Sequence, residues 1–160
     1  MRLFKSILGL GFLAIWLGMA VFCEAKFSNE CTDYIRRAAL SPTVETAVTN
    51  LQTAIDYAEK HGLTSGYTSI FLKEGDEDIG FWYQNLKASR EMLREAQNYE
   101  DLSERSVVLL KLNSSLMRDD HRVVVPVGLS RFPHKWVWAI TFFGALACAV
   151  IYMMYTLELI

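Results

Sequence analysis

The chain has 160 residues, of which 52% are hydrophobic and 21% are charged, and its formal net charge is −2. This apolar content is high for a soluble domain and low for a multi-pass transporter. The charge balance excludes a strongly basic nucleic-acid-binding surface. Most charged residues lie in the middle of the chain, between one apolar run at each end.

The first apolar run extends from Ile7 to Cys23 and follows a basic start at Arg2 and Lys5. Together with the residues just before it, the run has the length of about 20 residues that a helix needs to cross a bilayer. A cleaved signal peptide is the alternative, because a basic start and small residues near the end also fit that pattern. The run is long for a signal-peptide core, so we expect an uncleaved transmembrane anchor over residues 1–25.

The middle segment, residues 26–134, predicts a small helical domain. Its first part, from Phe27 to Leu40, can continue the preceding helix. Apolar residues then recur at helical spacing from Val44 to Ala58, after a Ser41-Pro42 start. Gly62 follows as a left-handed residue that ends this helix.

The rest of the middle segment predicts one extended stretch and two more helices. Thr64 to Leu72 is rich in residues that favour strands, which predicts a short extended segment. A helix is expected from about Asp78 to Gln97, with acidic residues at its start. A third helix is expected from Asp101, in a pattern that resembles a capping box, to about Arg118.

The last apolar run extends from Trp136 to Leu157 and has aromatic residues near both ends. It predicts a transmembrane helix within residues 135–160. Small residues in the two runs would let the spans pack closely, and these packing candidates are Ala14, Gly18, Gly144 and Cys148. The predicted fold is therefore an all-α membrane protein, in which two transmembrane helices flank a mainly three-helix soluble domain with a short extended segment.

The charges around the first run leave two orientations open. Arg2 and Lys5 favour a cytoplasmic amino end and an extracytoplasmic middle domain, whereas Lys26, Arg36 and Arg37 favour the opposite. We favour the extracytoplasmic orientation because the first helix usually dominates. The three cysteines suggest no disulfide framework, and Cys31 is expected to be an exposed thiol.

The sequence contains no phosphate-binding loop, no nucleophile elbow and no His or Cys pair at metal-ligand spacing. We therefore predict a non-enzymatic protein with no cofactor, no catalytic residue and no metal ligand. Aromatic residues concentrate in one stretch, which makes Tyr67, Phe71, Trp82 and Tyr83 candidate binding anchors, with Asn85 as a polar contact. The alternative, which we favour, is that Trp82 and Phe71 form the core of a small domain.

The same stretch, from Gly62 to Leu93, resembles a segment of uncharacterised small bacterial membrane proteins with a transmembrane helix at each end. The resemblance implies a protein of the bacterial inner membrane and implies no activity. The leading hypothesis is a membrane-anchored interaction or scaffold protein of the envelope. Its partners would be the lipid bilayer and either another protein or further copies of itself, with no nucleic acid. The alternatives are a sensor that couples ligand binding in the middle domain to the spans, and an oligomeric pore.

Overall fold

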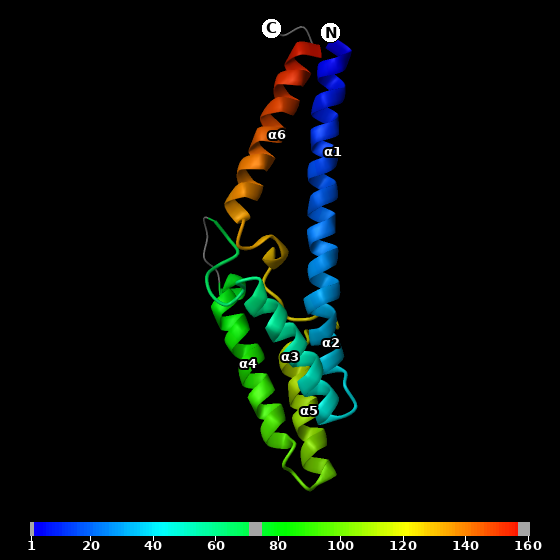
Figure 1. The fold of residues 1–160 in the computed structure, drawn as a ribbon, viewed down its shortest axis with the longest axis vertical. Coiled ribbons are helices and arrows are strands. Elements are labelled where there is room, and N and C mark those ends of the chain that lie inside the picture. Colours follow the sequence, from blue (N-terminus) through cyan, green and yellow to red (C-terminus); the bar gives the residue numbers. More distant parts are fainter. Residues whose placement is uncertain (1, 71–74, 157–160) are drawn as a thin grey trace.

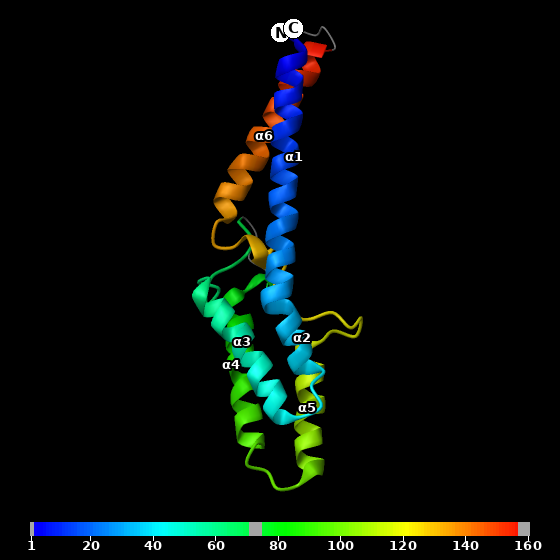
Figure 2. The ribbon, with the colours of Figure 1, turned by 45° about the vertical axis from the view of Figure 1, so that its right-hand side comes forward.

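The computed structural model describes residues 2–70 and 75–156, and this part of the chain is helical, with no strand. The α-helices are α1 (Arg2–Phe27), α2 (Asp33–Ala39), α3 (Val44–Lys60), α4 (Ile79–Ala96), α5 (Leu102–Leu116) and α6 (Lys135–Thr156). A π-helical turn, η1 (Ser28–Thr32), joins α1 to α2, and short 3₁₀ turns lie at Gly75–Glu77 (η2) and Leu129–Arg131 (η3). Figures 1 and 2 show an elongated molecule: α2 to α5 form a bundle at one end, and α1 and α6 form a two-helix arm at the other.

The predicted membrane architecture is wrong. Among the residues that the structure describes, no helix is both long and apolar enough to cross a membrane. The two transmembrane helices, the integral membrane location and the inner-membrane assignment are therefore corrected, whereas the all-helical character is confirmed.

The predicted continuation of the first helix is confirmed, because α1, η1 and α2 form one helical path into the bundle. The shielded residues of α1 recur at spacings of four, three and four: Trp16, Ala20, Cys23 and Phe27. The buried side chains then continue at Cys31, Ile35 and Ala38. A regular α-helix would rotate these later positions away from the earlier face, and the wider turn of η1 compensates for that rotation.

The bundle core lies where the sequence pattern of α3 and α4 predicts it. The apolar stripe of α3 is buried at Val44, Ala47, Leu51, Ala54, Ile55 and Ala58. Helix α4 buries Ile79, Trp82, Leu86, Leu93 and Ala96 against this stripe and α5. In α5 only Leu112 and Leu116 are fully buried, while Leu102 and Leu110 are exposed. Helix α5 therefore covers one side of the bundle with a narrow apolar seam.

Local side-chain chemistry fixes the helix ends. Helix α3 begins two residues later than the Ser41-Pro42 pattern predicts, because the Thr43 hydroxyl accepts a hydrogen bond from the Thr46 backbone N–H at 3.3 Å. Its carboxyl end is confirmed: Gly62 has φ +69°, and the Leu63 N–H donates to the Ala58 carbonyl at 2.8 Å. The Asp78 carboxylate accepts from the Phe81 N–H at 3.0 Å and so caps α4.

Phe71 and Leu72 of the predicted extended segment lie outside the described residues, and over residues 64–70 the segment is reduced to one antiparallel bridge, between Tyr67 and Asp78. In this bridge the Thr68 N–H donates to the Glu77 carbonyl at 3.1 Å, and the Ile79 N–H donates to the Gly66 carbonyl at 2.9 Å. These bonds hold the loop after α3 beside the first turn of α4. The loop thereby reaches the place where the bundle meets the arm.

Candidate functional site

Two of the predicted binding anchors, Trp82 and Tyr83, are buried in the bundle. Trp82 is 4% exposed, and its indole N–H donates to the Val124 carbonyl at 3.1 Å. The Tyr83 hydroxyl donates to the Glu59 carboxylate at 2.5 Å, which raises the pKa of Tyr83 together with burial of the ring. The polar atoms of both side chains already have partners inside the fold.

The other predicted anchors lie apart from these two. Tyr67 belongs to the bridge with Asp78, and Phe71 lies outside the described residues. Asn85 is exposed and lines, with Trp82, a shallow hollow of about 220 Å³ at the start of α4. The structure therefore brings Trp82 and Asn85 to one hollow and leaves Tyr67 and Tyr83 elsewhere.

The predicted packing candidates Ala14, Gly18, Gly144 and Cys148 are all exposed. A Cβ atom built at either glycine would meet no other atom within 4 Å. The buried small residues of the arm are instead Ala20 in α1 and Ala145 in α6.

The cysteines differ from expectation, because Cys31 is fully buried while Cys148 is exposed. The Cys31 thiol faces the Ala54 carbonyl at 3.9 Å, and burial raises its pKa to about 12. A thiol with such a pKa carries almost no thiolate near neutral pH and is a poor nucleophile. Among the described residues, no three His, Cys, Asp or Glu side chains gather as a metal site would require.

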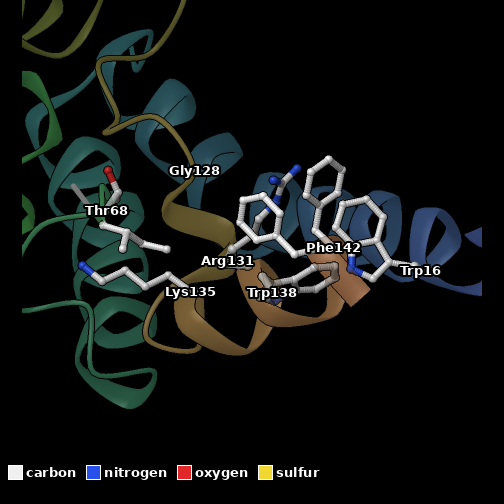
Figure 3. A pocket seen from close by; sticks show the side chains of 10 residues that line it. Trp16, Thr68, Gly128, Arg131, Lys135, Trp138 and Phe142 are labelled. Atoms are coloured by element: carbon white, nitrogen blue, oxygen red, sulfur yellow. The ribbon is translucent and has the colours of Figure 1, made fainter. Parts of the chain in front are cut away.

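A larger cavity, of about 370 Å³, lies where the arm joins the bundle (Figure 3). Its lining comes from four separate parts of the chain: α1, the loop after α3, the segment around η3, and α6. The residues are Trp16, Thr68, Ile70, Gly128, Arg131, Lys135, Trp138, Ala139, Phe142 and Phe143. We call this space the junction cavity.

One end of the junction cavity is an aromatic wall shared by α1 and α6. The indole N–H of Trp16 donates to the Thr141 hydroxyl at 3.0 Å. Its ring meets the Trp138 ring edge-on at a centroid distance of 5.6 Å and lies 5.4 Å from the Phe142 centroid. This contact holds the two arm helices together and supplies an apolar surface.

The other end is polar. In Figure 3, Thr68 and Lys135 lie away from the aromatic cluster, whereas the Arg131 guanidinium lies among the aromatic rings. The Lys135 ammonium donates to the Tyr67 carbonyl and, at 2.9 Å, to the Ser69 carbonyl, so it ties the loop to the start of α6. The Arg131 guanidinium lies over the Trp138 ring, with its carbon 5.8 Å from the ring centroid. A cavity that places a guanidinium against an aromatic wall can bind a small amphipathic molecule.

Local sequence patterns do not reveal the junction cavity, because its residues are separated by as many as 127 positions, from Trp16 to Phe143. The available signal is the pair of tryptophans at the start of the last apolar run, with Arg131 and Lys135 just before it. The aromatic residues near both ends of that run favour a transmembrane helix instead. Searches against protein-family models, curated proteins and solved structures gave no match to this chain. The resemblance noted over Gly62 to Leu93 therefore stays a prediction.

Proposed function

We propose that this protein is a non-enzymatic interaction protein that associates with a second copy of itself through the outer face of α6. Most residues of α6 from Trp136 to Val150 are exposed. The observation that carries the proposal is one row among them, at spacings of four, three, four and three. These residues are Trp136, Ile140, Phe143, Ala147 and Val150. This spacing is typical of a helix that packs along another helix.

The row lies on the side of α6 opposite to α1. Trp138, Thr141 and Ala145 are shielded residues on the side of α6 that faces α1. At about 100° per residue, the exposed row is centred about half a turn away from them. Ile140 is 68% exposed and Phe143 is 60% exposed, which is unusual for large apolar side chains that follow one helix face.

The chemistry of the row favours a second copy as the partner. The row contains no charged side chain that would select a different, complementary surface. Two copies related by a twofold axis would bury the same row on both chains. Gly144 and Ala147 lie beside the large residues and would allow the two helices to approach closely.

Crosslinking tests the proposed contact directly. With Cys23 and Cys148 changed to serine, Ala147→Cys places one accessible thiol on the row. Ala149→Cys, two residues further on and about 200° around the helix, is the matched control. A short bismaleimide should link copies through position 147 and not through position 149. Equal linking at both positions, or none at 147, would contradict the proposal.

The oligomeric state gives a second, independent test. Ile140→Asp places a charge in the row and should shift the full chain from dimer to monomer in light scattering coupled to size-exclusion chromatography. Leu110→Asp is the control, because Leu110 is 72% exposed on α5, away from the arm. A wild-type chain that stays monomeric at all concentrations tested would refute self-association.

A further inference from the structure

The junction cavity has an uneven distribution of charge. Its lining contains two cationic side chains, Arg131 and Lys135, and no carboxylate. The remaining lining is largely apolar, with four aromatic rings from the two arm helices. Cations next to a low-dielectric wall attract anions more strongly than they would in open water.

The two cations have different roles. The Lys135 ammonium is held by two backbone carbonyls of the loop, so its charge is fixed in place. The Arg131 guanidinium is exposed and contacts the Trp138 ring, and no ion pair is formed between it and a described carboxylate. The nearby Glu24 carboxylate accepts instead from the Ser130 hydroxyl at 2.5 Å. Arg131 therefore keeps donors that can bind an incoming anion.

Thr68 adds a polar group that lacks a partner. Its hydroxyl oxygen is shielded from solvent and has no hydrogen-bond partner among the described residues. Shielded polar groups of this kind are rare in folded proteins, because each costs about 1–3 kcal/mol when unpaired. Thr68 lies at the polar end of the cavity, near Lys135 (Figure 3).

From these observations we infer that the junction cavity binds a small organic anion with an apolar body. The anionic group, a carboxylate or a phosphate or sulfate monoester, pairs with Arg131 next to the aromatic wall. The alkyl or aromatic body lies against Trp16, Trp138 and Phe142. The cavity volume of about 370 Å³ is in the range of small-ligand sites, which begins at about 300 Å³. Phe143 belongs both to the cavity lining and to the exposed row of α6. The inference does not depend on the proposed self-association, because Arg131 and Trp16, which carry it, lie outside that row.

Titration calorimetry on the full chain tests the inference with four probes that separate charge from apolar contact. The probes are decanoate, decan-1-ol, decyltrimethylammonium and acetate. Decanoate and decyltrimethylammonium are used below their critical micelle concentrations, and decan-1-ol is used below its solubility limit. Decanoate should bind, the alcohol should bind about tenfold more weakly, and the cation and acetate should not bind. Added salt should weaken decanoate and leave the alcohol unchanged.

Two substitutions locate the site. Arg131→Gln should weaken decanoate about tenfold, as expected for loss of one charge-assisted hydrogen bond, without changing the alcohol. Arg122→Gln is the matched control, because Arg122 is an exposed arginine paired with Asp120 outside the cavity. Phe142→Ala should weaken decanoate and decanol together, and circular dichroism checks that the helices remain.

Each other outcome would overturn the inference. Equal binding of decanoate and decanol, with no effect of Arg131→Gln, would show that the cavity binds its ligand by apolar contact alone. Acetate that binds as tightly as decanoate would show a plain anion contact. Absence of decanoate binding, or equal loss in the Arg122 control, would show that the cavity is not the site.

Discussion

The hydrogen bond between the Trp82 indole and the Val124 carbonyl, 3.1 Å long, joins α4 to the segment that follows α5. Trp82→Phe removes the donor while it keeps an aromatic ring in the core. The unpaired carbonyl should cost about 1–3 kcal/mol, and the smaller ring should lose about 1 kcal/mol of apolar contact. We therefore expect the free energy of unfolding to fall by about 2–4 kcal/mol.

Urea unfolding followed by circular dichroism measures this change, and an unchanged m-value would show that the transition itself is preserved. For a chain of this size the same loss lowers the midpoint of thermal unfolding by roughly 5–15 °C. Phe81→Leu is the control, because the neighbouring Phe81 is 64% exposed, and it should change the free energy by less than about 0.5 kcal/mol. A Trp82→Phe variant as stable as this control would refute the reasoning.

Three further predictions follow from single contacts. The hydrogen bond to Glu59 raises the pKa of Tyr83 in the folded state. The stabilisation from this bond is present below the unfolded pKa of about 10 and is lost as the pH rises through the folded pKa. Urea midpoints between pH 9 and 12 should therefore fall more steeply for wild type than for Tyr83→Phe. Thiol labelling in the native state should modify Cys148 at once and Cys31 only after urea is added, because Cys31 is fully buried; rapid native labelling of Cys31 would contradict its burial. Gly66 has φ +103°, and a Cβ built there would lie 3.4 Å from the Phe132 ring. Gly66→Ala should therefore lower the free energy of unfolding by about 1–2 kcal/mol, measured by thermal melts. An unchanged melting midpoint would show that the loop adapts freely.

Local patterns of the sequence predict the bundle well, because each depends on residues close in the chain. The apolar stripe from Val44 to Ala58 predicts the buried face of α3, and Gly62 predicts its end. The Ser41-Pro42 pattern predicts the start of α3 two residues early, because Thr43 and not Ser41 caps the helix. Differences of this size are expected where several polar residues precede a helix.

The arm and its cavity could not be predicted in the same way. The hydrophobicity of the two end segments is a property of composition, and it does not specify which face of α1 meets α6. The contact between Trp16 and Thr141 joins residues 125 positions apart, and no local period encodes it. Arg131 and Lys135 are ordinary cations in the sequence, and only the folded chain brings them into one cavity with Trp16 and Thr68.

The π-helical turn at Ser28–Thr32 determines how far α2 is rotated about the helix axis relative to α1. Above the turn, Trp16 points toward α6, and below it, Ile35 points into the bundle. Removing one residue from the turn would rotate α1 by about 100° relative to α2 while shortening the path by only about 1.5 Å. The bundle could then keep its core, while Trp16 would leave the junction cavity and a different face of α1 would meet α6. The register of this one turn thus determines whether the aromatic wall of the cavity exists.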